Sequence, residues 1–368
     1  MKCLAFDLGK VLFDFDYHIA LNKLEHKLDV PAKTVVDELF YNNFATDFEK
    51  GLVATDDFYR KFKNKFASRI TYEEFVDIWC EIFTPKPDII SLVGRLRLCY
   101  PVYLISNINE LHFNHLYAKH PEVFSLFDDL LLSFRLKSLK PEKEIYEALQ
   151  KKCGCAYSDI VYIDDREDLI REAKQLGLQC ILCTDYNALT KDLTDYGVLI
   201  PSDTETETFV LLKHKIEQSK NPLIIGIGNT LRNDDSVGPA IAEAITGRIK
   251  YTVINAGASP ENFISTIRRT QSDLLLLVDA AKLPDNKSCA LLPANNIQNL
   301  SLYFTHDASL KMMMHYLQNE TASDILFFAI NANDYAVGET MSPSVQRIKT
   351  MTENFFMRFF AIHTKITI

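Results

Sequence analysis

Residues Leu223–Pro239 read LIIGIGNTLRNDDSVGP, an apolar run followed by two glycines one residue apart. The run is typical of a buried strand that leads through a loop into a helix. A dinucleotide-binding loop has the pattern Gly-x-Gly-x-x-Gly, which here needs a third glycine at position 231. That position is Leu231, and Asn255 and Ala256 stand near the place of the usual acidic ribose partner. The stretch therefore predicts an α/β domain and argues against a dinucleotide site.

The alternation of strand and helix patterns continues on both sides of this stretch. In the second half, strand patterns recur at 250–257, 273–281, 288–294 and 324–332, and helical patterns at 236–247, 260–269, 309–318 and 342–360. In the first half, strand patterns lie at 1–9, 102–107, 124–134, 159–165 and 178–184, and helical patterns at 141–154 and 166–177. Strands separated by helices imply a parallel sheet covered on both faces. We therefore predict two doubly wound, three-layer α/β domains, the first of them Rossmann-like.

The chain has 368 residues, which suits two domains of ordinary size. We place the first at 1–195, with a helical segment at about 19–83, and the second at 222–368. Between them the composition becomes polar and acidic, with PSDTETET and later SKNP. This change predicts an interdomain linker at 196–221.

The formal net charge of −9 and the pI of about 5.5 argue against a nucleic-acid partner, which would require a basic face. Asp7 interrupts the first apolar stretch, and the longest apolar runs are too short to span a bilayer. We therefore expect a cytoplasmic protein without membrane insertion. Eight cysteines in a chain of this length predict free thiols rather than a disulfide scaffold.

Chemically active residue types stand at several strand ends of the first half. Asp7 ends the first strand, Ser106 and Asn107 end the second, Asp164 and Asp165 end DIVYIDD, and Lys140 precedes a helix. Each of them alone is usually an ordinary solvated residue. Together they suit phosphoryl transfer, because a carboxylate attacks phosphorus, carboxylates bind Mg²⁺, and a hydroxyl and a lysine hold the transferring oxygens.

The stretches FDLGKVLFDFD, LISN, LKPEKEIY and IDDREDLIREAKQLG, in this order, resemble the haloacid dehalogenase superfamily, and most closely its sugar-phosphate phosphatases. The resemblance implies a helical cap at 19–83. It also implies Asp7 as nucleophile, the Ser106–Asn107 pair and Lys140 around the phosphate, and Mg²⁺ on Asp7, Asp164 and Asp165. Most phosphatases of the superfamily have a second aspartate where this chain has Gly9. Glycine offers a backbone carbonyl to the metal but transfers no proton.

A second set of candidates lies in the second half. Asp234 and Asp235 open a helix, where one aspartate is explained as a helix cap and the other is not. Asp279 ends the apolar run LLLLVDAA, and His306 precedes another helix. Two carboxylates and an imidazole are a plausible transition-metal site with open positions.

This set resembles the nickel–iron hydrogenase maturation endopeptidases, through GIGNTLRNDDSVGP, AGASPEN, LLLLVDAA and FTHDASL in order. The resemblance implies Asp235, Asp279 and His306 as nickel-contacting residues of an aspartic-type endopeptidase. The Ni²⁺ arrives in the substrate, a [NiFe]-hydrogenase large subunit precursor whose C-terminal extension is removed. Asn229 and Asn255 are expected to contact that substrate; relatives commonly have an acidic residue at the latter position.

The predicted function is thus a bifunctional hydrolase that processes the precursor and hydrolyses a small phosphorylated metabolite. Two alternatives stay open. The chain is a sugar-phosphate or nucleotide phosphatase with the second domain as a passenger, or its first domain is a non-catalytic docking module, marked by Gly9.

Overall fold

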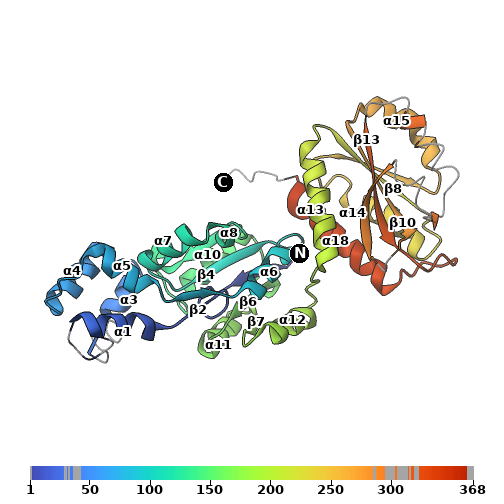
Figure 1. The fold of residues 1–368 in the computed structure, drawn as a ribbon. Helices are drawn as coiled ribbons and strands as arrows, with labels where there is room; N and C mark the ends of the chain where they lie inside the picture. The colour runs from blue at the N-terminus through green and yellow to red at the C-terminus, as the bar shows by residue number, and fades with distance from the viewer. Residues whose placement is uncertain are drawn as a thin grey trace. The chain divides into compact units, whose positions relative to one another are not determined.

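A computed structural model describes residues 2–28, 31, 34–35, 43–284, 287–294, 303–304, 314, 316–318 and 323–362. The chain folds into two compact units, residues 1–200 and 201–368 (Figure 1). Both are α/β units built on a mainly parallel sheet, as the strand and helix patterns predict.

The first unit contains a parallel sheet of five strands in the order β5-β4-β1-β6-β7. The strands are β1 (Cys3–Phe6), β4 (Val102–Ser106), β5 (Asp129–Leu132), β6 (Ile160–Asp164) and β7 (Gln179–Leu182). The helices around them are α6 (Pro87–Leu96), α7 (Glu110–Lys119), α8 (Pro121–Phe124), α9 (Ser133–Leu136), α10 (Lys143–Cys153), η1 (Tyr157–Asp159), α11 (Glu167–Gln175) and α12 (Tyr186–Asp195). Every residue of β1, β4 and β6 is buried, because helices cover both faces of the sheet.

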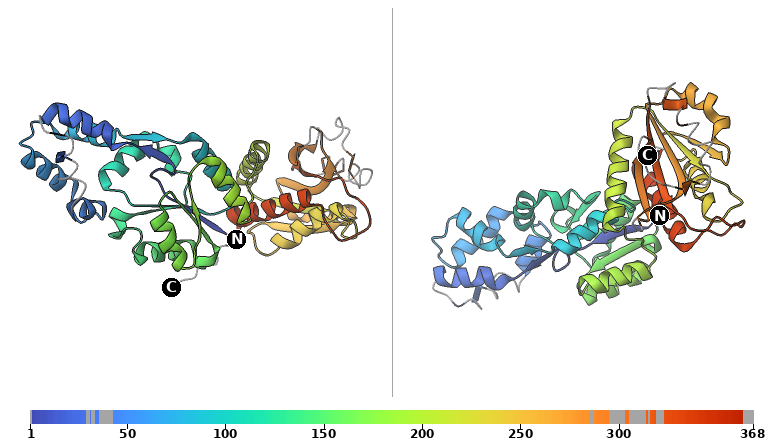
Figure 2. Two further views of the ribbon diagram at one scale, coloured as in Figure 1. Left: turned by 90° about the horizontal axis from the view of Figure 1, so that it is seen from below. Right: turned by 45° about the vertical axis from the view of Figure 1, so that its right-hand side comes forward.

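A helical cap is inserted between β1 and the rest of this sheet. A two-stranded antiparallel stem, β2 (Phe13–Phe15) with β3 (Phe83–Pro85), carries it. The cap helices are α1 (Tyr17–Leu28), α3 (Asn43–Glu49), α4 (Thr55–Lys65) and α5 (Tyr72–Cys80). Figure 2 shows these blue helices at one end of the first unit. Their core is aromatic: the Phe48 and Phe58 rings stack at 4.1 Å, and Phe62 lies 4.7 Å from Phe75.

The second unit contains a sheet in the order β11-β13-β10-β8-β9, with β12 paired to β10. The strands are β8 (Pro222–Ile227), β9 (Thr252–Gly257), β10 (Leu274–Lys282), β11 (Cys289–Pro293), β12 (Tyr303–Phe304) and β13 (Asp324–Asn331). The helices are α13 (Asp203–Gln218), η2 (Asp234–Ser236), α14 (Val237–Ile245), η3 (Pro260–Phe263), α15 (Ile264–Thr270) and α18 (Pro343–Phe360). The pairing is parallel except at β11 and β12.

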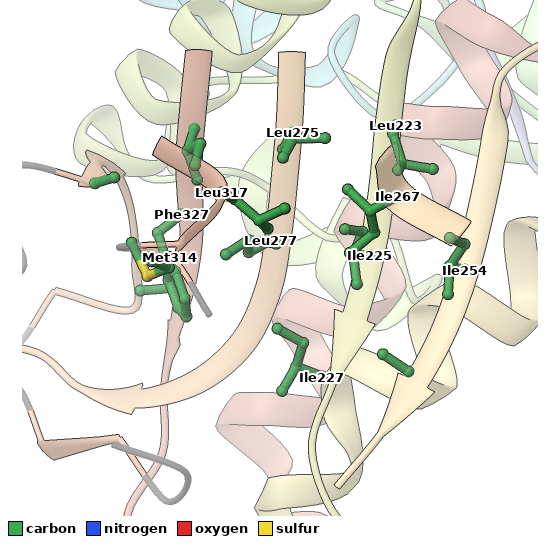
Figure 3. Close-up of a cluster of buried hydrophobic side chains, with 14 of the residues drawn as sticks. Leu223, Ile225, Ile227, Ile254, Ile267, Leu275, Leu277, Met314, Leu317 and Phe327 are labelled. Atoms are coloured by element: carbon green, nitrogen blue, oxygen red, sulfur yellow. The ribbon is translucent and has the colours of Figure 1, made fainter. Parts of the chain in front are cut away.

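Alternate residues of the central strands form a continuous apolar core on one face of this second sheet. Leu223, Ile225 and Ile227 of β8 lie beside Leu275 and Leu277 of β10 (Figure 3). Ile267 of α15, together with Met314 and Leu317, packs against this core from outside the sheet. Only part of the helix predicted at 309–318 lies within the described residues.

The predicted linker at 196–221 needs correction, because most of it forms helix α13 of the second unit. Ser202 and Glu205 form a capping box at its start. Phe209 is fully buried and contacts Phe328 and Phe355 at ring distances of 5.8 and 5.1 Å. The acidic composition that suggested a linker is the first turn of an amphipathic helix, where negative charge interacts favourably with the helix dipole.

Two further expectations concern cysteines and membranes. The eight cysteines are free thiols, and Cys180 and Cys183 are buried. Among the residues that the structure describes, no helix combines the length and apolar character needed to cross a bilayer.

Candidate functional site

The predicted residues of the first unit converge on one cavity of about 190 Å³. The carboxyl ends of parallel strands meet at one edge of a sheet, which explains how segments far apart in sequence come together. Cap and stem residues complete the lining. The predicted site residues that line it are Asp7, Gly9, Ser106, Asn107, Lys140, Asp164 and Asp165.

The centre of this site is a buried lysine between two buried carboxylates. Lys140 Nζ lies 2.6 Å from Asp7 Oδ1 and 2.6 Å from Asp164 Oδ2. Burial raises the pKa of Asp7 to about 6, and the nearby Asp164 adds to this while Lys140 opposes it. Burial by itself lowers the pKa of Lys140, but the charges of Asp7 and Asp164 outweigh burial and raise it. The lysine is therefore held charged, as the local countercharge of the site.

Asn107 positions this lysine through its backbone. Its side-chain Nδ2 donates to the Lys140 carbonyl at 3.0 Å, and its Oδ1 accepts from the Lys140 amide at 2.7 Å. The Asn107 side chain thus holds both the backbone N–H and the backbone carbonyl of Lys140. Ser106 is buried at the end of β4 and lines the cavity. Both residues lie where the LISN stretch predicts them, and their catalytic roles stay predictions.

Asp7, Asp164 and Asp165 each offer one carboxylate oxygen, and these three oxygens lie within 4.8 Å of one another. Burial, and then the charge of Asp164, raises the pKa of Asp165. A cluster of carboxylates is the donor set that a hard divalent cation prefers, so these residues fit Mg²⁺.

Several residues of the site have no counterpart in the sequence prediction. The Tyr162 hydroxyl donates to Asp164 Oδ2, and the Arg166 amide donates to Asp164 Oδ1 at 2.9 Å. Strand periodicity offers a signal for Tyr162, because residues two apart on β6 point to one face. Glu49 and His112 line the cavity as well, and nothing in their local sequence indicates it.

In the second unit, the glycines of the opening stretch permit close packing. A Cβ atom at Gly226 would lie 2.3 Å from the Gly238 carbonyl oxygen, and one at Gly228 would lie 1.9 Å from the Asp235 carbonyl oxygen. Gly228 also has a φ of 140°, which disfavours a side chain. The start of α14 therefore lies directly against β8, and the glycines serve helix–strand contact.

The two adjacent aspartates have different surroundings, although both are fully buried. Asp234 accepts hydrogen bonds from the amides of Asn333, Asp334 and Ser342 and from the Ser342 hydroxyl. It therefore fastens the loop between β13 and α18. Asp235 accepts from the Asn229 amide at 3.1 Å.

Asp279, near the end of β10, is also fully buried and lies close enough to Asp235 for their charges to interact. Burial raises the pKa of Asp279 well above its usual value, and the charge of Asp235 raises it further. Within the described ranges, Asp279 Oδ2 has no hydrogen-bond partner. Tyr335, which the sequence did not indicate, lies close to Asp279 and Asp235. Burial raises the pKa of its hydroxyl group, and the charges of these two carboxylates raise it further. A buried carboxylate oxygen without a partner fits a cation ligand.

The other predicted site residues of this unit are Asn229, Asn255 and His306. Asn229 Oδ1 accepts from the Leu231 amide at 2.9 Å, and Asn255 Oδ1 accepts from the Gly257 amide at 3.1 Å, so both side chains bond to nearby backbone. His306 lies outside the described residues, so its place in the site stays a prediction.

The first unit is thus a three-layer α/β domain with a helical cap, and carboxylates and a lysine line its cavity. A model of the haloacid dehalogenase-like hydrolase family matches residues 1–177. D-ribitol-5-phosphate phosphatase of Bacteroides thetaiotaomicron is 28% identical over 188 residues, 49% of this chain and 90% of that protein. Hydrogenase 3 maturation protease of Escherichia coli K12 is 29% identical over 139 residues, 37% of this chain and 86% of that protein.

A solved structure of a haloacid dehalogenase-family enzyme from Bacteroides thetaiotaomicron, in complex with magnesium and inorganic phosphate, is 25% identical. It covers 51% of this chain and 98% of its own, with a TM-score of 0.45. The chain is a fusion of a haloacid dehalogenase-like hydrolase domain at the N-terminus with a C-terminal part homologous to hydrogenase maturation proteases.

Proposed function

We propose that the chain is a bifunctional hydrolase with two separate sites. The first unit hydrolyses a small phosphomonoester with the help of Mg²⁺, and the second removes the C-terminal extension of a [NiFe]-hydrogenase large subunit precursor that carries nickel. The observation that carries the first activity is the contact of Lys140 with both Asp7 and Asp164 in one cavity.

In the first reaction, an oxygen of Asp7 attacks phosphorus, the ester P–O bond breaks, and the alcohol leaves. Asp7 then carries the phosphoryl group as an aspartyl phosphate. Lys140 and Ser106 hold the non-bridging oxygens, and Asn107 fixes the lysine backbone. Mg²⁺ on Asp7, Asp164 and Asp165 would offset the charge of the phosphate. A polyol phosphate is a fitting substrate class, in view of the ribitol-phosphate phosphatase relative.

In the second reaction, the nickel is part of the substrate. Asp279, whose Oδ2 has no partner among the described residues, and Asp235 provide buried carboxylates for it, and His306 is expected to add an imidazole. Contact with the metal positions the scissile bond, so that a precursor without nickel is not held in place. The relative from Escherichia coli, a hydrogenase 3 maturation protease, supports this proposal.

The first activity is tested with a panel of phosphomonoesters that includes D-ribitol 5-phosphate, with and without Mg²⁺, on the wild type and Asp7→Asn. We expect turnover that requires Mg²⁺ and falls on the order of 10⁴-fold or more without the nucleophile. Turnover no higher than that of Asp7→Asn across the panel would instead support the docking-module alternative.

The second activity is tested by mass measurement of nickel-loaded and nickel-free precursor after incubation with wild type, Asp235→Ala and His306→Ala. We expect a mass loss only for the loaded precursor and the wild type. Normal cleavage in either variant, or of the nickel-free precursor, would contradict the assignment. Phosphatase activity serves as the internal control, because it resides in the other unit.

A further inference from the structure

The first site has no group at position 9 that carries a proton. A Cβ atom there would lie 2.9 Å from Cε1 of Phe15, so the phenylalanine ring occupies the space beside Gly9. Hydrolysis of an alkyl phosphate requires a proton for the departing alkoxide, and later the removal of a proton from the attacking water. A proton carrier from another part of the cavity is therefore needed.

The carboxylates and imidazoles that line the cavity, within the described part of the chain, are Asp7, Asp164, Asp165, Glu49 and His112. The three aspartates form the carboxylate cluster described above, and one of them is the nucleophile. Asp164 is further occupied by Lys140. The choice thus falls between Glu49 and His112.

Both ring nitrogens of His112 are occupied. Nδ1 lies 3.1 Å from Nδ2 of Asn109, and Nε2 lies 3.2 Å from the carbonyl oxygen of Trp79. Burial lowers the pKa of His112 to about 4, so the ring is neutral at physiological pH. A ring held on both sides has no nitrogen to offer a substrate, which leaves Glu49.

Glu49 is the last residue of cap helix α3, and contacts with the core of the first unit fix its backbone over the cavity. The Ser133 hydroxyl donates to the Glu49 carbonyl at 2.7 Å. The next residue, Lys50, forms an ion pair with Glu142 at 2.5 Å. Two anchors on adjacent residues hold this end of the cap against the core, and Glu49 lines the cavity.

The surroundings of Glu49 suit a group that both gives and takes a proton. Burial raises the pKa of its carboxyl group, and the charge of Arg166 opposes the rise. Tyr17, also in the lining, lies near enough that the charge of Glu49 adds to the effect of burial in raising the tyrosine pKa. A carboxyl group with a raised pKa is the usual form of a general acid in enzymes.

We infer that Glu49 is the general acid and base of the phosphatase site and replaces the aspartate that position 9 lacks; this inference rests on the phosphatase function proposed above. When Asp7 attacks phosphorus and the ester P–O bond breaks, protonated Glu49 gives its proton to the leaving oxygen, which departs as the alcohol. Glu49, now a carboxylate, takes a proton from water as that water attacks the aspartyl phosphate. Phosphate leaves, and Asp7 and protonated Glu49 are restored.

The test compares wild type, Glu49→Gln and the control Glu73→Gln, which alters an exposed carboxylate on cap helix α5. Each is assayed with D-ribitol 5-phosphate, whose alkoxide needs a proton, and with 4-nitrophenyl phosphate, whose leaving group does not. For Glu49→Gln we expect kcat on the polyol phosphate to fall about 10²–10⁴-fold. With 4-nitrophenyl phosphate we expect a rapid burst of about one nitrophenolate per enzyme, followed by slow turnover, because only the attack of water needs the base. The control behaves as the wild type.

The outcomes separate this inference from the phosphatase proposal. If the wild type hydrolyses both substrates but Glu49→Gln loses the nitrophenolate burst as well, the residue positions substrate and carries no proton, and the inference fails. Equal rates in Glu49→Gln and wild type also overturn it. A wild type inactive on both substrates overturns the phosphatase function itself. Glu49→Asp, which keeps a carboxyl group on a shorter side chain, should retain part of the activity on the polyol phosphate and so exclude misfolding as the cause.

Discussion

Both units of this chain hold buried carboxylates at or after the carboxyl ends of parallel strands, in the loops and turns that follow them, yet the two groups balance charge differently. In the first unit, Lys140 lies 2.6 Å from both Asp7 and Asp164. In the second, the charge that acts on buried Asp279 is another carboxylate, Asp235, and Asp279 Oδ2 has no partner within the described ranges.

The two sites therefore differ in the source of the positive charge beside their carboxylates. The first carries its own countercharge, since Lys140 opposes the rise that burial causes in the pKa of Asp7. The second keeps a buried carboxyl group whose pKa is strongly raised, which is a state that a divalent cation would relieve. Under the proposed function, that cation is the nickel of the precursor, and the buried Asp279 carboxyl group is the means of sensing it.

The largest expected effect concerns the folding units that hold the two sites. Fragments 1–200 and 201–368 should each fold, whereas a fragment that starts at 222, the predicted domain limit, should not. The shorter fragment lacks α13, and with it buried Phe209 and the ion pair of Glu205 with Arg347 at 2.6 Å. Thermal unfolding and solubility of the three fragments provide the measurement. A cooperative transition in 222–368 would show that α13 is dispensable.

Removal of the internal countercharge should destabilise the first unit strongly. Lys140→Met leaves two buried carboxylates without their cation, for which a loss of about 3–5 kcal/mol in the free energy of unfolding is expected. Urea unfolding without divalent cations measures it, and added Mg²⁺ should recover part of the loss. Lys143→Met, which breaks an exposed pair with Glu147, is the control and should unfold as the wild type does.

The packing beneath Asp235 is expected to be nearly as sensitive. Gly228→Ala should lower the free energy of unfolding of the second unit by about 3 kcal/mol or more, because its Cβ would lie 1.9 Å from the Asp235 carbonyl oxygen at a φ of 140°. Gly247→Ala meets no atom of the described residues within 4 Å and bears only the strain of its φ of 71°, about 1–2 kcal/mol. Similar losses at both positions would refute the close-approach account.

Acid should weaken the first unit through His112. Its pKa falls from 6.5 to about 4 on folding, so below pH 6.5 the unfolded chain binds a proton that the folded chain does not. Stability is therefore lost as the pH falls from 6.5 towards 4, by about 2 kcal/mol at pH 5. Unfolding curves of fragment 1–200 and its His112→Gln variant over this range measure the difference. Identical pH slopes would exclude His112 as the cause.

Much of the architecture and the first cavity could be predicted from local pattern. Buried strands that end in Asp7, Ser106 and Asp164 sit at one edge of a parallel sheet, and the structure brings these residues together. Glu49 was not predictable, because its place at the cavity depends on how a cap helix folds back onto the core. Nothing within one turn of that residue in the sequence distinguishes it from a glutamate on the surface of a helix.

Helix α13 shows a second limit of local reasoning. Its apolar residues Phe209, Leu212 and Ile216 follow helical spacing, but the acidic first turn dominated the composition and suggested a linker. Whether an amphipathic helix bridges two domains or covers one of them is decided by the packing partner, here Phe328 and Phe355. Composition contains no information on that partner.

The smallest expected effect has the opposite sign and tests the role of Asp279 directly. Asp279→Asn removes a buried carboxyl group whose pKa is raised by burial and by Asp235, so it should stabilise the second unit slightly at pH 7. The folded wild type binds a proton that the unfolded chain lacks, so its stability rises as the pH falls and the advantage of the variant shrinks in acid.

Asp273, which directly precedes the first residue of β10, is the matched control. It accepts hydrogen bonds from Ser219, Lys220 and Asn221, and these lower its pKa to about 2. Asp273→Asn should therefore destabilise the same unit. The measurement is thermal unfolding of both variants at pH 7 and pH 5, together with an assay of precursor cleavage. A destabilised Asp279→Asn that still cleaves precursor would mean that this carboxylate is a structural residue, and the contrast between the two sites would fall with it.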